Sequence, residues 1–164
     1  MAGIRSNSDI IKGSMLMVFM GESPIGFATS HALNITTNTT EVSTKDNGDF
    51  ASIIPQNISW EITAENLYSD AGEQAYMTAQ MNKTLVTLKF AKAGNYESEN
   101  EKGVIGNEEH GEWTVGTIIA QGQAYITSFS INAPAGENAT MSVTFTGVGE
   151  LKTNTTPTQG TQGN

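Results

Sequence analysis

The sequence predicts a mainly β protein, a β-sandwich or barrel of about seven strands with one flanking α-helix. Extended runs in which apolar and polar residues alternate recur along the chain, and turn signals rich in Gly, Pro and Asn separate them. Only one stretch has helical periodicity. At 164 residues, the chain has the length of a single domain.

The two ends of the chain differ in composition from its middle. Residues 1–12 are expected to form a flexible N-terminal arm, and the low-complexity residues 152–164 a disordered C-terminal tail. The β domain is therefore predicted over residues 13–151. It begins with a buried strand at 14–20, a Gly-Glu-Ser-Pro turn and a second short strand at 25–29.

Two extended stretches follow, joined by "KDNGD", whose Asn-Gly pair is a signal for a tight turn. Pro55 cannot donate a hydrogen bond to a neighbouring strand, and it indicates that the second stretch begins at an edge or a bulge. The apolar residues of this stretch stand at even positions and are expected on one face: Ile54, Ile58, Trp60 and Ile62.

The one predicted helix covers residues 70–83. Asp70 is placed as its N-cap, and Glu73 stands three residues on, as in a capping box. Residues at i, i+4 spacing supply a narrow apolar stripe, made of Ala75, Met77, Ala79 and Met81. A strand is predicted after the helix, with an inner face of Val86, Leu88 and Phe90.

The C-terminal half is predicted to hold a loop and a long hairpin. Residues 93–112 are glycine-rich, acidic and aperiodic, and are expected to form a long exposed loop. An extended segment follows at 112–133, with a bulge or bend near Gly122. Residues 134–138 are the predicted turn, and residues 139–151 the last strand.

The strands of this hairpin have one apolar and one hydroxylated face. The expected buried face consists of Phe129, Ile131, Met141, Val143 and Phe145. The other face is small, uncharged and hydroxylated. Its members are Ser128, Ser130, Ser142, Thr144 and Thr146.

Charge and composition exclude several classes of function. The chain has 17 acidic and 8 basic residues and a formal net charge of -9, which disfavours binding to DNA or to anionic membranes. No apolar run approaches the ~18 residues of a membrane span, and the start of the chain lacks the apolar region of a signal peptide. We therefore expect a soluble protein, without a membrane partner, that stays in the cell where it is made.

No catalytic constellation is apparent in the sequence, so we expect neither an enzyme nor a cofactor or metal site. The chain has no cysteine, and its two histidines, His31 and His110, are expected to be exposed. Trp60 and Trp113 are interpreted as core residues. "KDNGD" lacks the ligand pattern of a calcium loop, which favours a hairpin turn. By elimination, the chain is interpreted as a structural or binding protein.

Several stretches, in order, resemble the major tail (tail tube) proteins of long-tailed bacteriophages: "KGSMLMVFMG", "TSHALNITTNTTEVSTKDNGDF", "SWEITAENLYSDAGEQAYMTAQ" and "GQAYITSFSINAPAGENATMSVTFTGVGEL". The resemblance covers about residues 12–151. It implies a β-sandwich with one helix whose subunits close into hexameric rings around an inner β-barrel. In that family, stacked rings form the tube through which DNA leaves the virion without specific binding.

The resemblance also implies partners and assembly residues. The partners are further copies of the chain and the tape-measure, tail-terminator and tail-initiation proteins, and the location is the virion tail, assembled in the cytoplasm of the bacterial host. Residues 36–56 correspond to a long loop that reaches toward the adjacent ring, with an ordinary surface hairpin as the alternative. The candidate inter-ring residues are Thr44, Lys45, Asp46, Asn47, Gly48 and Asp49. The resemblance further makes the hydroxylated face of the final hairpin a candidate wall against a neighbouring subunit or a lumen.

Two other functions remain open from the sequence. One is the tube protein of a contractile injection or type VI secretion machine, which shares the ring. The other is a β-sandwich ligand-binding or adhesion module, with the 93–112 loop and Trp113 as a glycan or calcium site. The chain ends shortly after its last predicted strand instead of continuing into a decoration domain, so adhesion by an appended module is not expected.

Overall fold

A computed structural model describes residue 11 and residues 13–26, 28–42, 44–45, 48, 50–69, 74–93 and 114–153. Apart from residues 11, 93, 152 and 153, the predicted N-terminal arm, acidic loop and C-terminal tail lie outside the described residues. The predicted helix cap of Asp70 and Glu73 lies outside them as well, as do His110 and Trp113.

The described residues form one antiparallel sheet of seven strands in the order β2-β1-β5-β6-β7-β4-β3, with one α-helix. This confirms the predicted mainly β class. The strands are β1 (Leu16–Met20), β2 (Ser23–Pro24), β3 (Ala28–Val42), β4 (Ser52–Leu67), β5 (Val86–Ala93), β6 (Val115–Asn132) and β7 (Thr140–Thr153). The helices are the short 3-10 helix η2 (Gly13–Met15) and α1 (Gln74–Met81).

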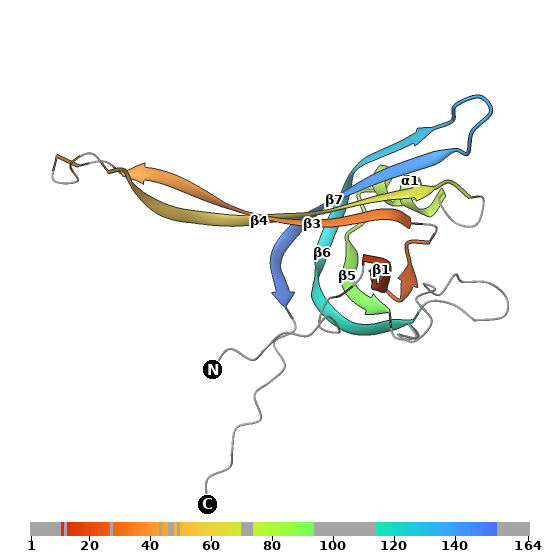
Figure 1. Cartoon of the computed structure of the whole chain (residues 1–164), viewed down its shortest axis with the longest axis horizontal. Helices are drawn as coiled ribbons and strands as arrows, with labels where there is room; N and C mark the ends of the chain where they lie inside the picture. Colours follow the sequence, from red (N-terminus) through yellow and green to blue (C-terminus); the bar gives the residue numbers. More distant parts are fainter. Residues whose placement is uncertain are drawn as a thin grey trace, which may run out of the picture.

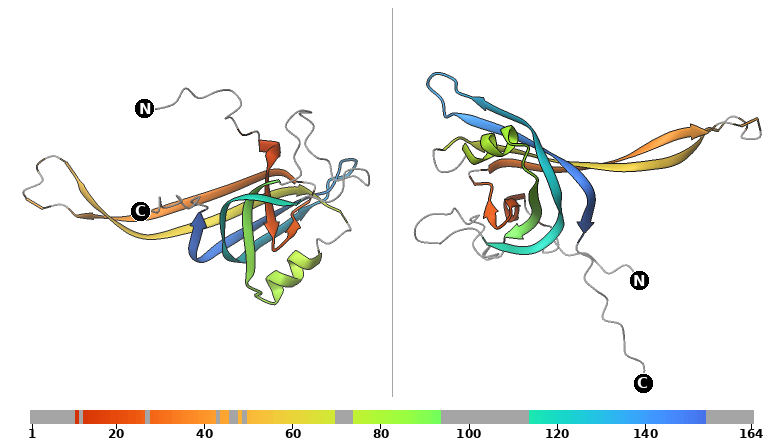
Figure 2. Two further views of the ribbon diagram at one scale, coloured as in Figure 1. Left: turned by 90° about the horizontal axis from the view of Figure 1, so that it is seen from below. Right: turned by 180° about the vertical axis from the view of Figure 1, so that it is seen from behind.

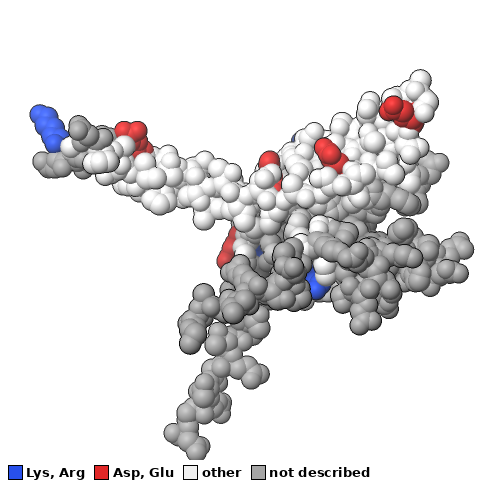
Figure 3. All heavy atoms as spheres, viewed as in Figure 1, with Lys and Arg blue, Asp and Glu red and all other residues white. Residues whose placement is uncertain are grey.

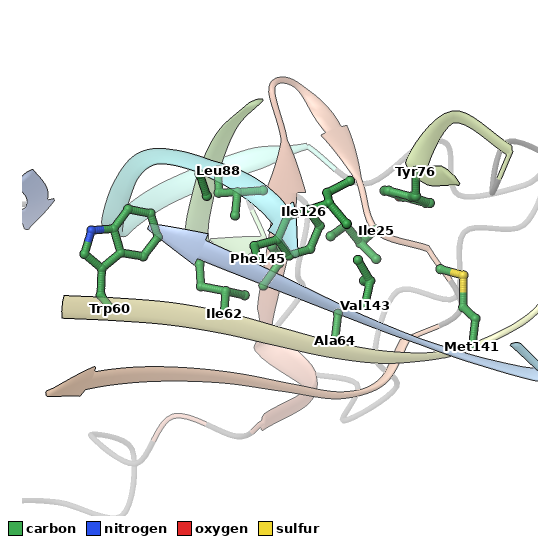
Figure 4. Close-up of a cluster of buried hydrophobic side chains, with 12 residues drawn as sticks. Ile25, Trp60, Ile62, Ala64, Tyr76, Leu88, Ile126, Met141, Val143 and Phe145 are labelled. Carbon is green, nitrogen blue, oxygen red and sulfur yellow. The ribbon is translucent and has the colours of Figure 1, made fainter. Parts of the chain in front are cut away.

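The sheet curls over, so that β1 and β5 lie across from β4 and β7 and enclose the core with them (Figures 1 and 2). β6 bends sharply to connect the two parts, and its register with β7 shifts between Gln121 and Gln123. The predicted bulge near Gly122 is therefore confirmed. Twelve buried residues form the main core cluster, and Figure 4 shows most of them: Val18, Ile25, Trp60, Ile62, Ala64, Tyr76, Leu88, Ala124, Ile126, Met141, Val143 and Phe145.

Trp60 lies at the point where β4 leaves β7. The pairing of these two strands ends at Glu61 and Thr146, and the Trp60 ring fills the space beyond it, with 4% of its surface exposed. Its indole Nε1 donates a hydrogen bond to the carbonyl oxygen of Gly149 (3.1 Å). The prediction that Trp60 is a core residue is confirmed.

The helix buries different residues from those predicted. α1 contacts β6, and it places Tyr76 in the core with Ala79 partly buried beside it. Met77 and Met81 are exposed, so the predicted stripe of small residues and methionines is wrong. A tyrosine ring reaches further from the helix than an alanine, and burying it removes more apolar surface from water.

The largest projection of the molecule is a two-stranded ribbon, shown in Figure 1. β4 pairs with β7 only from Glu61 to Leu67, so its earlier residues pair with β3 alone. We call residues 35–42 of β3 and 52–60 of β4 the ribbon. Beyond Trp60 nothing described covers the ribbon, so Ile54 and Ile58 are 51% and 64% exposed. Ile58 shares the face of Trp60 and Ile62, as predicted, but Ile54 lies on the opposite face, so its prediction is wrong.

Candidate assembly surfaces

The strands β6, β7, β4 and β3 present one face to the core and the other to solvent. Along β7, Met141, Val143 and Phe145 are buried, which confirms their prediction, and the residues between them point to the opposite side. We call that opposite side the hydroxyl face. The register places all five predicted residues on it: Ser128, Ser130, Ser142, Thr144 and Thr146. Whether they line a lumen or a subunit contact stays a prediction.

A bulge in β6 adds one more hydroxyl to this face. The register of β6 with β7 shifts between Ile126 and Ser128, so Thr127 and Ser128 stand together on the solvent side. The Oγ1 atoms of Thr127 and Thr146 lie 2.9 Å apart, within hydrogen-bond distance. Simple alternation along β6 does not find Thr127, because the bulge changes which residues share a face.

The predicted buried face is only partly correct on β6. Phe129 is half-buried and packs against the main core. Ile131 is 43% exposed, so the prediction that it is buried is wrong. The cause is that the end of the β6–β7 hairpin extends past the body of the protein, as Figure 1 shows.

Two glutamates on β4 belong to the hydroxyl face, and the sequence interpretation missed them. Glu65 is paired with Ser142 of β7, and Glu61 with Thr146. Asn34 of β3 donates from Nδ2 to Glu61 Oε1 (3.4 Å). Their alternation with Trp60, Ile62 and Ala64 is the signal that could have placed them. No Lys or Arg occurs in β3, in β4 or in residues 125–132 and 140–146, so the charge of this face is negative.

The four-stranded part of the sheet has a free backbone edge at each end. β3 is the last strand in the sheet order, so one of its edges is unpaired with any described strand. At the other end, β5 reaches along β6 only to Ala124, and residues 125–132 pair with β7 alone. Such edges are templates for pairing with another chain. Since neighbouring strands alternate in direction, β3 and β6 run antiparallel to each other.

The edge of β1 is closed instead by side-chain and backbone hydrogen bonds. The backbone N–H of Ile25 donates to the carbonyl of Val18 (2.9 Å), and the N–H of Val18 donates to Nδ1 of His31 on β3 (3.3 Å). His31 thereby joins the two ends of the curled sheet. The prediction that it is exposed is wrong, since it is half-buried and its burial lowers the pKa of His31 to about 4.

The ribbon is largely uncharged. Residues 35–40 and 51–60 hold no charged side chain, and Figure 3 shows white surface along the ribbon, with red and blue only toward its end. Among the predicted inter-ring residues, Thr44, Lys45 and Gly48 are exposed there, and Asp46, Asn47 and Asp49 lie outside the described residues. Gly48 has a φ of 60°, as tight turns require.

Two properties of the described residues concern membrane and metal binding. No helix among them is long and apolar enough to cross a membrane. They also contain no cluster of three or more His, Asp or Glu side chains that could hold a metal ion. The 94–113 segment, where the predicted glycan or calcium site falls, lies outside the described residues.

The fold and these edges agree with a comparison of sequences. A sequence model of the phage tail tube protein family matches residues 14–153. The chain belongs to the phage tail tube protein family. It is a structural subunit of a tail tube, as the resemblance of its sequence stretches, above all the final hairpin, predicted. No match was found among the curated proteins.

Solved structures show the tail tube fold independently. The chain is similar to a chain of the virion of a native gene transfer agent (GTA) particle, with a TM-score of 0.64 and 13% identity, over 88% of this chain and 98% of that one. The same values hold for a chain of the tail of an empty GTA particle with C6 symmetry. The SPP1 tail tube is similar with a TM-score of 0.58 and 14% identity, over 88% of this chain and 79% of that one.

Proposed function

We propose that six copies of this tail tube subunit close into a ring, and that stacked rings form the conduit for DNA during ejection from the virion. The similar GTA tail has C6 symmetry, which supports six copies per ring. The subunit is then located in the virion tail and is assembled in the cytoplasm of the bacterial host. Its further partners are the tape-measure, tail-terminator and tail-initiation proteins.

The pair of free edges is the observation that carries this proposal. The part β6-β7-β4-β3 has an even number of strands, and its outer edges belong to strands of opposite direction. A copy related by rotation therefore brings its β6, from Tyr125 to Asn132, antiparallel to the β3 of its neighbour. Repeating this step continues the sheet around a closed barrel without leaving an edge.

The hydroxyl face is the side of that barrel which we assign to the lumen. The core, with β1 and β5, occupies the other side of the four strands, so that side cannot line an open channel (Figure 4). The side chains of this face are hydroxyls and the carboxylates of Glu61 and Glu65, so the face offers no cationic group to DNA phosphates. Because cationic contacts dominate binding to nucleic acid, such a wall lets DNA pass without retaining it.

The ribbon supports the stacking of rings. It projects well beyond the body in every view of Figures 1 and 2, and it carries exposed apolar residues. In the proposed tube it reaches the adjacent ring, with the turn at residues 44–49 at its end. Its charge-free length favours contact between copies whose net charge is -9.

Electron microscopy of the purified protein tests the proposal. We expect rings with sixfold averaged top views, or tubes, at high protein concentration or after addition of tail-initiation proteins. A protein that stays strictly monomeric under both conditions would contradict it. Rings of another symmetry would support the tube but would contradict the proposed number of six copies per ring.

A further inference from the structure

The two faces of the ribbon follow from the strand register. Cross-strand partners share a face, and Ile35 is paired with Trp60, so Ile35 lies on the side that continues into the core. Residues of odd number from 35 to 41 on β3 share that side. We call it the core-side face of the ribbon, and the opposite one, which continues into the hydroxyl face, the hydroxyl-side face.

A bulge in β4 changes which of its residues lie on each face. Thr37 is paired with Ile58, but Thr39 is paired with Pro55, so β4 has one extra residue between them. Beyond the bulge, Ile53 is the partner of Glu41 and lies on the core-side face. Ile54 is the partner of Thr40 and lies on the hydroxyl-side face.

The bulge therefore gives the ribbon exposed apolar residues on both faces. Ile35, Ile53 and Ile58, on the core-side face, are 55%, 62% and 64% exposed. On the hydroxyl-side face, Ile54 is 51% and Val42 is 37% exposed. A ribbon designed to lie on a single surface needs apolar residues on only one face, with polar residues on the other.

Stability gives a second reason for contacts on both faces. A two-stranded ribbon is marginally stable in water unless something packs against it. Beyond Trp60, the described body of the subunit gives this ribbon no support, because β7 leaves β4 at Glu61. Each isoleucine removed from water contributes favourably, and both faces have such residues to bury.

We propose that the ribbon is inserted between two neighbouring copies of this chain, each of which covers one of its faces. The proposal rests on the proposed tube, in which every subunit contributes one ribbon and meets several other copies. Like-charged copies with a net charge of -9 approach most easily where no charge is present, and the ribbon between residues 51 and 60 is such a place. The partners that cover the two faces of the ribbon are therefore two other copies of the chain.

Single cysteines test the proposal cleanly, because the chain has none of its own. The variants I53C and I54C place one thiol on each face, at neighbouring positions of the same strand. We expect both thiols to react with a maleimide about tenfold more slowly in assembled tubes than in isolated subunits, since reaction then requires local opening. The isolated subunits of each variant are its control.

The outcomes separate this inference from the proposed function. Tubes in which I54C reacts at the rate of isolated subunits while I53C is protected would mean that the ribbon lies on one surface, and would overturn the inference alone. Reaction of both at the isolated rate would do the same. If the unaltered protein forms neither rings nor tubes, the proposed function fails and the inference fails with it.

A second measurement uses side chains that keep the β-branched shape. I53T and I54T each replace an ethyl group by a hydroxyl and keep the other methyl group. T40S, at the cross-strand partner of Ile54, is a mild control. We expect each isoleucine variant to raise the critical concentration for tube assembly about tenfold. Their subunits are expected to unfold at the same temperature as the unaltered protein. An unchanged critical concentration for I54T would overturn the inference.

Discussion

The indole ring of Trp60 lies directly on the backbone of Gly147, where an added Cβ would stand 2.0 Å from Cε2 of the ring. The ring also crosses Gly122 of β6, where a Cβ would stand 2.5 Å from Cζ2. The two glycines thus make room for one tryptophan at the base of the ribbon. The direction in which the ribbon leaves the body is held by this contact between β4, β6 and β7.

The substitution G147A is expected to destabilise the subunit by about 3 kcal/mol, because the methyl group and the Trp60 ring cannot occupy the same space. Chemical denaturation measures the loss. G13A is the matched control, since nothing lies within 4 Å of a Cβ at that position, and its effect should stay within about 0.5 kcal/mol. Equal stabilities of the two variants would contradict the contact.

Replacing the buried Asn66 by aspartate is expected to make the stability of the subunit depend on the protonation of the new carboxyl group. Its side chain is 1% exposed, and its Nδ2 donates to the carbonyl of Gly26 (2.6 Å). N66D would place a buried carboxylate against that carbonyl, which we expect to cost about 3 kcal/mol or more at pH 7. The loss should shrink as the pH falls and the carboxyl is protonated. E65Q, on the exposed face next to it, is the control.

His31 predicts a loss of stability on acidification. Its pKa is lowered by burial from the usual 6.5 to about 4, so the unfolded chain binds the proton more readily than the folded one. The stabilisation is complete above pH 6.5 and is lost as the pH falls toward 4. The full difference is about 3 kcal/mol, and about 2 kcal/mol of it should be lost between pH 6.5 and pH 5.

The variant H31N isolates this effect, because asparagine offers an acceptor to the Val18 N–H without titrating in this range. Urea denaturation at pH 7 and at pH 5 is the measurement. The stability of the unaltered protein should fall more steeply with decreasing pH than that of H31N. Parallel pH profiles of the two proteins would show that His31 is accessible to protons in the folded state.

The double substitution S130R/T144R tests the hydroxyl face. Both residues lie on that face: Ser130 is paired with Ser142 of β7, and Thr144 with Thr63 of the carboxylate-bearing strand β4. We expect impaired DNA release or ring closure, because arginine binds phosphate, while the subunit's stability changes by no more than about 1 kcal/mol. S130Q/T144Q is the uncharged control of similar length. Normal infectivity of particles that carry the arginine variant would show that this face is ordinary solvent-exposed surface.

Alternation of apolar residues was sufficient to predict most strands and the buried side of β7. It succeeded where a strand is regular and one of its faces meets the core, as from Met141 to Phe145. It failed at Ile54, because the bulge opposite Asn38 reverses the faces and the ribbon has no body beneath it. Pro55 indicated an edge or a bulge in the sequence, but it did not show that the bulge changes the face on which Ile53 and Ile54 lie.

Other features depend on contacts between residues distant in sequence. The burial of His31 results from the curl that brings β3 against Val18, which no local pattern contains. The free edge of β6 exists because β5 begins only at Val86, opposite Ala124. Glu61 and Glu65 were readable in principle, since they alternate with buried residues, but only the sheet order places them beside the hydroxyls of β7.

In the proposed ring, where each subunit contributes four strands, the number of copies sets the width of the channel in coarse steps. Six copies would give 24 strands, and at ~4.8 Å per strand and a strand tilt of ~40° the barrel wall would be about 48 Å across, or about 38 Å once side chains of ~5 Å on either side are subtracted. Five copies would leave only about 30 Å by the same arithmetic. The loss of a single subunit would therefore narrow the channel by about 8 Å, so accurate counting of subunits at the start of assembly would keep the clearance around the passing genome constant.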